Sequence, residues 1–258
     1  MKLRTILLVL SLLAFLSAST GGYFYYSSIK ESAFNEAKRQ AVARLEMLKK
    51  NLSSFLLENV KPVKTLAGMP QLRRSLSHID AASLSKANAV LDHFKNTLDV
   101  GVCYLMAGDG LTVASSNRYD QDSFVGKNFA FRPYFKQAIQ GKPAIYLALG
   151  VASGKRGAYY SHPIYENSQN APVGIVVIKA SIELIEKEIE TSHNEIVLVT
   201  DPHGVIFISN RKEWLYNLLW KFSSEEIPQI AESRQFGKGP WNWTGLESKG
   251  DYIVDRQG

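Results

Sequence analysis

Two positively charged residues stand in apolar surroundings and are the first candidates for chemistry in this sequence. Arg132 lies in the aromatic cluster FAFRPYF, and Lys179 lies in the aliphatic run VGIVVIKAS. A cation inside an apolar run costs free energy unless an anion or another acceptor meets it. A planar guanidinium can grip one carboxylate through two bonds, and an ammonium supplies a compact charge for another. The two residues therefore predict a pocket for a small molecule with two negative ends.

Two hydroxyl side chains are candidates to complete this pocket. Successive side chains of a strand alternate between its faces, so Tyr159 and Ser161 share one face. A register slip of one residue would present Tyr160 instead. Two other interpretations stay open. In the first, Arg132 only caps a short helix or pairs with a surface acid. In the second, Lys179 only marks the solvent face of an edge strand.

The sequence offers little for an enzyme, a cofactor or a metal. Its five histidines lie far apart without zinc-binding spacing, and the phosphate-binding pattern GxxxxGK[ST] is missing. The one cysteine, Cys103, can form neither an internal disulfide nor a cysteine-based metal site, and we expect it to be buried. The net charge of +6 comes from scattered basic residues, which argues against a nucleic-acid partner. We expect no catalytic residues, no cofactor and no metal in this chain.

The amino terminus predicts a membrane location. Lys2 and Arg4 precede a long apolar run. One interpretation is a cleavable signal peptide that ends near Ala18. The other, which we favour, is a signal anchor over residues 5–28, since about 20 apolar residues cross a bilayer. Either way, residues 30–258 are expected outside the cytoplasmic membrane, in the periplasm.

Helical periodicity dominates the next part of the chain. In residues 30–60 apolar side chains recur at spacings of three and four, which predicts a long helical spine. Its apolar stripe either packs on its own domain or pairs with a second copy of the chain, so we expect a homodimer through this segment. Pro62 is expected to interrupt the spine, and further helices are predicted over 63–77 and 81–98.

The pattern then changes to strands. Apolar alternation and turn residues predict seven strands and two short helices. The strands are 101–107, 111–116, 143–150, 157–164, 173–180, 195–200 and 204–209, and the helices are 132–140 and 181–192. With 45% apolar and 21% charged residues, the composition is that of an ordinary globular protein.

The order of these features resembles a known family. A signal anchor, a long helix, and then FRPYF, YLALG, SGKRG, YYSHPI and VGIVVIK are similar to the periplasmic sensor region of C4-dicarboxylate sensor histidine kinases. The resemblance implies an α+β fold in which a long N-terminal helix carries two stacked PAS-like (double Cache) subdomains with antiparallel sheets. It implies four parts, listed in order: a signal anchor at 1–29, a helical spine at 30–78, a membrane-distal ligand-binding subdomain at 79–190 and a membrane-proximal subdomain at 191–258. We expect the last part to be incomplete.

The resemblance also implies roles for individual residues. Arg132 and Lys179 would hold the dicarboxylate, with Tyr159 and Ser161 as hydroxyl donors. The residues that would close the pocket are Phe129, Tyr146, Val151 and Ala152. Two departures bear on affinity and on the choice of diacid. Hydroxyl residues are common in the family where this chain has Val151 and Ala152, and tyrosine is common where it has Phe129.

The function implied is that of a sensor. We expect an extracytoplasmic domain that binds succinate, fumarate or malate as the input module of a two-component sensor histidine kinase. No kinase segment is recognisable in these 258 residues, so we expect no enzymatic activity from them. Two alternatives stay open: a chemoreceptor-like sensor for another small anion or an amino acid, and an interaction domain without a ligand.

Overall fold

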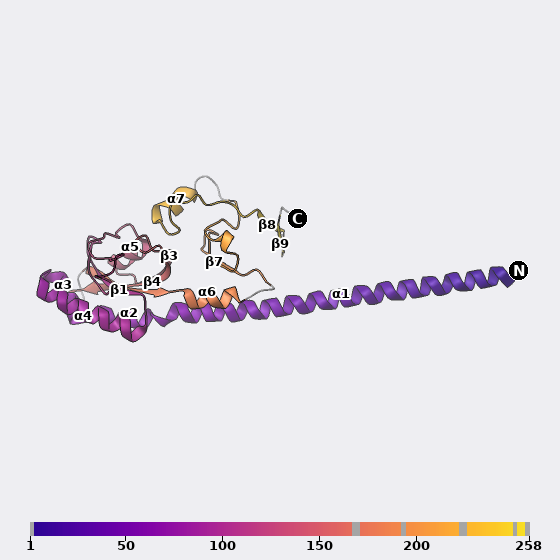
Figure 1. Ribbon diagram of the computed structural model, residues 1–258, viewed down its shortest axis with the longest axis horizontal. Helices are drawn as coiled ribbons and strands as arrows, with labels where there is room; N and C mark the ends of the chain where they lie inside the picture. Colours follow the sequence, from indigo (N-terminus) through magenta and orange to yellow (C-terminus); the bar gives the residue numbers. More distant parts are fainter. Residues whose placement is uncertain (1–2, 167–170, 192–194, 222–225, 250–251, 256–258) are drawn as a thin grey trace. The chain divides into compact units, whose positions relative to one another are not determined.

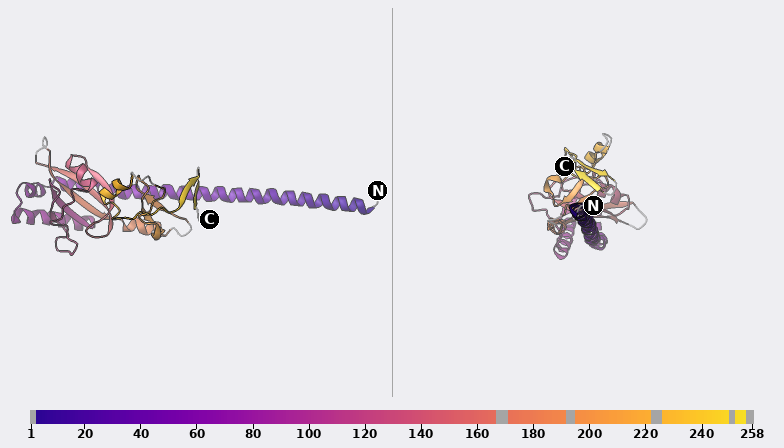
Figure 2. Two further views of the ribbon diagram at one scale, coloured as in Figure 1. Left: turned by 90° about the horizontal axis from the view of Figure 1, so that it is seen from above. Right: turned by 90° about the vertical axis from the view of Figure 1, so that its right-hand side faces the viewer.

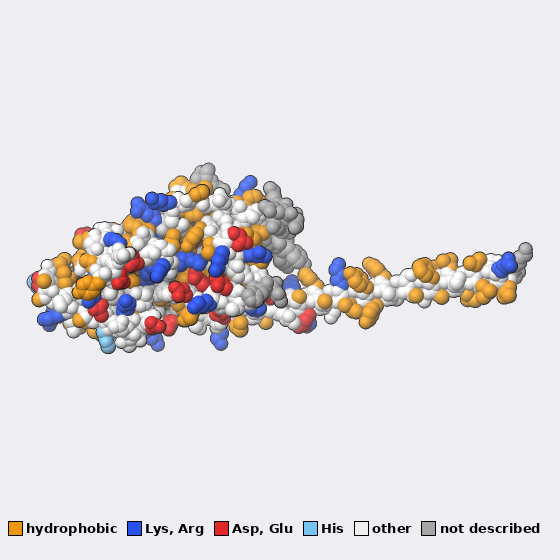
Figure 3. Space-filling view, viewed as in Figure 1, with side chains coloured by type: hydrophobic (Ala, Val, Ile, Leu, Met, Phe, Trp, Pro, Cys, Tyr) orange, Lys and Arg blue, Asp and Glu red, His pale blue; other side chains and the backbone are white. Residues whose placement is uncertain are grey.

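A single long helix forms the amino-terminal part of the chain in the computed structural model, which describes residues 3–166, 171–191, 195–221, 226–249 and 252–255. This helix, α1, runs from Leu3 to Glu58 (Figure 1). Its first half is long and apolar enough to cross a membrane, and its apolar side chains are exposed along its surface (Figure 3). The chain divides into two units, residues 1–51 and residues 52–258.

The helices after α1 correct one prediction. The segment predicted as one helix over 63–77 is two helices, α2 (Val60–Ala67) and α3 (Pro70–Ser77). Pro70 causes the break, because a proline disfavours helical backbone in the residue before it, and Met69 is extended. Pro62 interrupts the long helix as predicted, because α1 ends at Glu58, whose carbonyl would need the missing N–H of residue 62, and Pro62 itself lies in the first turn of α2.

The predicted helix over 81–98 is confirmed as α4 (Ala81–Leu98). Its start follows from a reciprocal cap. The Asp80 carboxylate accepts a hydrogen bond from the Ser83 backbone N–H, and the Ser83 hydroxyl accepts one from the Asp80 backbone N–H. Such a cap satisfies backbone donors that have no partner inside the helix, and it is readable in the sequence.

Five antiparallel strands form the main sheet (Figure 2). They are β1 (Val102–Ala107), β2 (Thr112–Ser115), β3 (Ala144–Leu149), β4 (Arg156–Tyr165) and β5 (Pro172–Ser181). The order across the sheet is β2-β1-β5-β4-β3, so β5 is the central strand and β3 is an edge. In the pairing of β4 with β5, Tyr159 lies opposite Lys179. The five predicted strands in this region are confirmed.

The two faces of the sheet are covered by different helices. The short helix α5 (Pro133–Ile139) packs on the face that carries Tyr159, whose ring stacks on Tyr134 of that helix. Tyr160 points to the other face, where its hydroxyl donates to the Phe55 carbonyl at the end of α1. Helices α2, α3 and α4 contact the sheet as well (Figure 1). The register that presents Tyr159 rather than Tyr160 to the candidate pocket is therefore the observed one.

The carboxyl-terminal part holds shorter elements. They are α6 (Glu183–Glu190), β6 (Leu198–Thr200), β7 (Ile206–Ser209), a 3-10 turn (Lys212–Trp214), α7 (Glu226–Ser233), β8 (Leu246–Lys249) and β9 (Tyr252–Asp255). β6 pairs with β7 and β8 with β9, each pair antiparallel. The end of the helix predicted over 181–192 lies partly outside the described residues. The boundaries predicted at residues 78 and 190 stay a prediction.

Candidate functional site

Arg132 is the most buried charged side chain around the candidate site. It occupies the position before α5, with extended backbone, and only 2% of it is exposed. Its guanidinium does not cap the helix. It donates one hydrogen bond to the Leu149 carbonyl at 2.7 Å and one to the Arg234 carbonyl at 3.0 Å. The side chain is held inside the protein by backbone oxygens of two distant segments.

Lys179 lies on the central strand β5 and is 6% exposed, so it does not lie on the solvent face of an edge strand. Its ammonium donates to the Ser153 hydroxyl at 2.7 Å and lies 5.6 Å from the ring centre of Tyr159 and 5.9 Å from that of Phe124. Burial lowers the pKa of Lys179 to about 8. Burial thus makes the charged form of the amine less favourable in free energy, and an anion beside it would offset part of this effect.

Glycines make room for these groups. A Cβ at Gly150 would lie 2.9 Å from the Tyr159 hydroxyl oxygen and 3.0 Å from the Lys179 nitrogen. A Cβ at Gly157 would lie 3.0 Å from Cε of Lys179. Both distances are shorter than ordinary carbon contacts, so a larger residue would displace the lysine. The phenol and the ammonium therefore meet at the backbone of Gly150.

A small cavity is lined by Arg132 and Tyr159, and Lys179 lies beside it. Its walls consist of aromatic and small residues together with one charge, from the loop before α5, from α5, from β4 and from the turn between β3 and β4. The lining residues are Phe124, Phe129, Arg132, Tyr134, Gly150, Val151, Ala152 and Tyr159. The volume of this cavity is about 10 Å³, which is room for about one water molecule. Pockets that enclose small ligands usually measure about 300–1,000 Å³, so this cavity has no room for a diacid unless its walls move apart.

Five of the predicted residues line the cavity. They are Phe129, Arg132, Val151, Ala152 and Tyr159, and Lys179 lies directly beside it. The other two predicted residues lie one layer away. The Ser161 hydroxyl donates to the Tyr134 carbonyl at 3.0 Å, and the Tyr146 ring packs against Tyr134 with its centre at 6.1 Å. Both therefore support α5 at the back of the cavity.

Sequence reasoning missed four side chains at or next to the site. Ser153 accepts the bond from Lys179, Phe124 covers the lysine, and Tyr134 forms the floor together with Tyr104, whose hydroxyl donates to the Tyr134 hydroxyl at 2.8 Å. Ser153 is adjacent to predicted residues in the same turn, so its position gave a usable signal. Phe124 lies in a loop without periodicity, and no local pattern points to it.

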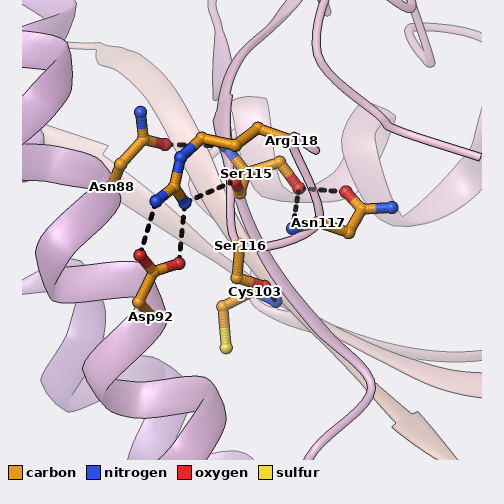
Figure 4. A network of polar contacts seen from close by, with 7 residues as sticks. All are labelled: Asn88, Asp92, Cys103, Ser115, Ser116, Asn117 and Arg118. Carbon is orange, nitrogen blue, oxygen red and sulfur yellow. Dashed lines mark hydrogen bonds and ion pairs between the residues drawn. The ribbon is translucent and has the colours of Figure 1, made fainter. Parts of the chain in front are cut away.

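The loop that carries Phe124 is held by a polar network (Figure 4). The Asn117 side-chain oxygen accepts from the Ser115 hydroxyl at 2.6 Å and from the Phe124 backbone N–H at 3.2 Å. Next to it, the Arg118 guanidinium donates two hydrogen bonds of 2.7 Å to the Asp92 carboxylate on α4. The network fixes the loop to β2 and to α4, and through Phe124 it fixes one wall of the cavity.

Together the geometry describes a closed, helix-borne α+β domain with two buried cations and a phenol around one cavity. Such a set can bind anionic groups through charge-assisted hydrogen bonds. Among the described residues no group of three histidine, cysteine, aspartate or glutamate side chains is arranged to hold a metal ion.

Residues 26–258 match the Cache domain family, and the chain belongs to this family. The C4-dicarboxylate transport sensor protein DctB of Pseudomonas aeruginosa is 35% identical over 187 residues, which are 72% of this chain and 30% of that protein. DctB of Rhizobium meliloti is 29% identical over 194 residues, 75% of this chain and 31% of that protein. The chain thus spans about a third of the length of these curated relatives.

Solved structures agree with this assignment. The sensor domain of the V. cholerae histidine kinase DctB superposes with a TM-score of 0.74 at 28% identity, over 81% of this chain and 80% of that chain. The sensory domain of the Campylobacter jejuni chemoreceptor Tlp3 superposes with a TM-score of 0.57 at 14% identity, over 79% and 82%, which shows the fold alone. The predicted family resemblance and the predicted α+β fold class are confirmed.

Proposed function

We propose that this chain is the extracytoplasmic sensor region of a two-component sensor histidine kinase and that it binds four-carbon dicarboxylates such as succinate, fumarate or malate. The observation that carries the proposal is the burial of Arg132 and Lys179 around one cavity beside the Tyr159 hydroxyl. One cation would receive each carboxylate, as the sequence analysis expects. The names of the two curated relatives support the same ligand class.

A specific observation weighs against an amino-acid ligand. Structures of the chemoreceptor Tlp3 are described with isoleucine or L-valine, so the fold accommodates such ligands. An amino acid brings an ammonium that needs an acidic partner once water is removed. The described lining of this cavity contains a guanidinium and no carboxylate. The nearest acid with an electrostatic effect on Lys179 is Asp122, outside the lining. A dianion fits this charge distribution better than a zwitterion does.

The small volume of the cavity supports the remaining alternative, a domain without a ligand. At about 10 Å³ the cavity must open to enclose a diacid. The Cache fold would allow this if the loop with Phe124 or the turn with Val151 moved outward. A ligand that binds the form closed around it better than the empty form shifts the equilibrium between these two states. Such a shift is how a sensor reports that its site is occupied.

Titration calorimetry with succinate tests the site. We expect the wild-type chain to bind, and Arg132→Ala to bind at least about 100-fold more weakly, because two charge-assisted hydrogen bonds are lost at about 1.5–3 kcal/mol each. Lys136→Ala is the matched control, since Lys136 is exposed on the same helix and lies outside the cavity lining. Equal affinity of Arg132→Ala and wild type would place the ligand elsewhere. Binding of L-valine but not succinate would favour the amino-acid alternative.

A further inference from the structure

A short segment of the carboxyl-terminal part runs along the edge of the main sheet next to the cavity. We call residues 232–236 the strap. The Leu149 backbone N–H at the end of β3 donates to the Gln235 carbonyl at 2.8 Å, and the Gln235 side-chain amide donates to the Leu147 carbonyl at 2.8 Å. The strap therefore supplies hydrogen-bond partners to an edge strand that would otherwise present them to solvent.

The strap is held at both ends. At one end the Arg234 guanidinium lies 4.8 Å from the ring centre of Phe131. Glu232 also lies 3.5 Å from the Lys136 ammonium of α5, but both side chains are exposed, so this contact contributes little to holding the strap. At the other end Phe236 is buried and packs against Phe207 of β7, with 5.9 Å between ring centres. A displacement of the strap would thus reach the small β6–β7 sheet.

One side chain joins the strap to the cavity. Arg132 lines the cavity and donates to the Arg234 carbonyl of the strap and to the Leu149 carbonyl of β3. A carboxylate attracts a guanidinium more strongly than a neutral carbonyl does, because the attraction between two opposite charges adds to the hydrogen bonds, which can be bidentate. A dicarboxylate end group that enters the cavity competes with the Arg234 carbonyl for the same guanidinium.

We propose that Arg132 is a coupling residue whose bond to the Arg234 carbonyl is exchanged for a bond to the ligand, so that occupancy of the cavity loosens the strap and is transmitted toward β7. This inference rests on the proposed function and adds its regulation. Because coupling between two equilibria is reciprocal, a weaker strap must raise the affinity for the ligand by the same factor by which the ligand weakens the strap.

Amide hydrogen exchange of the ligand-free chain tests the connection without reference to any ligand. Exchange of the Leu149 amide reports whether the strap is in place. We expect Arg132→Gln to speed it at least about 10-fold, since the hydrogen bonds of a charged group are lost. Lys136→Gln is the matched control, because it releases only an exposed contact with the same strap and should leave the Leu149 amide unchanged.

Titration with succinate tests the exchange of partners. Saturating succinate should speed exchange at Leu149 in the wild-type chain. Gln235→Ala removes one bond of the strap and leaves every cavity-lining side chain intact, so it should bind succinate about 3- to 10-fold more tightly. If Arg132→Gln does not fold, Gln235→Ala still tests the coupling between the strap and the site.

The outcomes separate the two proposals. If succinate binds and Arg132→Ala abolishes binding, but Gln235→Ala has wild-type affinity, the strap is uncoupled from the site and the inference is wrong. Slower exchange of Leu149 with succinate would mean that the ligand tightens the strap, which also overturns it. If no dicarboxylate binds the wild-type chain, the proposed function is wrong. Arg132 then only stabilises the fold through its bonds to the two backbone carbonyls.

Discussion

At the scale of single residues, the charge of Lys179 is the most sensitive part of the site. Burial is the main cause that lowers its pKa to about 8, opposed by Asp122 and reinforced by the positive charges of Lys155 and Arg132. The unfolded chain keeps the ordinary value of 10.5. Between these two values the unfolded state binds more protons than the folded state, so stability of the empty protein should rise with pH from about 8 to 10.5.

Ligand affinity should have the opposite pH dependence. The protonated amine is the form that attracts a carboxylate, and above about pH 8 the empty site holds it mostly neutral. Binding then requires proton uptake. We expect the affinity for succinate to be constant between pH 6 and 7.5 and to fall up to about tenfold per pH unit above pH 8. Calorimetry in buffers of different ionisation enthalpy would measure the proton uptake directly.

Lys179→Arg is the control for this pH dependence. A guanidinium stays charged throughout this range, so the variant should bind with an affinity that does not change between pH 7 and 9, whatever its absolute value. A wild-type affinity that is equally flat over this range would show that Lys179 does not face the ligand.

At the scale of elements, the loop between β2 and α5 decides the shape of the cavity. Asn117 is 2% exposed and serves two donors with one oxygen, the Ser115 hydroxyl and the Phe124 backbone N–H. Its own amide donates to the Asp122 carbonyl at 3.3 Å. These bonds position the Phe124 ring over Lys179. The loop has no regular structure to hold it, so a buried polar residue takes that role.

We expect Asn117→Ala to lower the free energy of unfolding by about 1–3 kcal/mol, because buried donors lose their acceptor. It should also weaken succinate binding several-fold, since Phe124 is then no longer held against Lys179. Urea denaturation and calorimetry measure the two effects.

Arg118→Ala is the neighbouring control. It removes the ion pair with Asp92, in which both side chains are partly exposed, so solvent screening reduces its contribution, and we expect a loss below about 1 kcal/mol. It should leave ligand affinity unchanged. If Arg118→Ala and Asn117→Ala weaken binding equally, general loosening of the loop explains the effect, and Asn117 has no specific role.

At the scale of the whole molecule, α1 is the element that would connect the sensor region to a membrane and to a second copy. Several large apolar side chains between residues 30 and 60 are exposed on it, among them Phe34, Val42 and Leu45. An exposed apolar stripe on a long helix is typical of helix pairing. We propose that this stripe mediates a homodimer whose residues 30–258 lie in the periplasm.

Disulfide cross-linking tests both parts of that proposal. Cys103 is buried, and burial raises the pKa of its thiol to about 12, so a cysteine introduced on α1 would be the reactive thiol. We expect Leu45→Cys to form covalent dimers in intact cells, because disulfides persist in an oxidising compartment outside the cytoplasm. Lys50→Cys, on the opposite side of the helix, should cross-link much less. Equal yields from the two variants, or none, would contradict the paired helix or its location.

Much of the fold and part of the site could be predicted because the signals are local. The apolar runs of β1 and β5 and the turn residues beside them are written in neighbouring residues. The burial of Arg132 and Lys179 was predictable for the same reason, since each stands in an apolar run that a folded chain removes from water. The break near Pro62 was predictable in the same way, since α1 ends at Glu58, four residues before the proline.

The sequence by itself determined the strands and the two cations, because periodicity and composition act over a few residues, and the motifs from FRPYF to VGIVVIK indicated the family through a resemblance. Only the tertiary structure decided what the cations meet. The bond from Arg132 to the Arg234 carbonyl spans 102 positions of the chain, and Phe124 reaches Lys179 from a loop without periodicity. Such contacts depend on how distant segments pack, and no pattern of neighbouring residues records them.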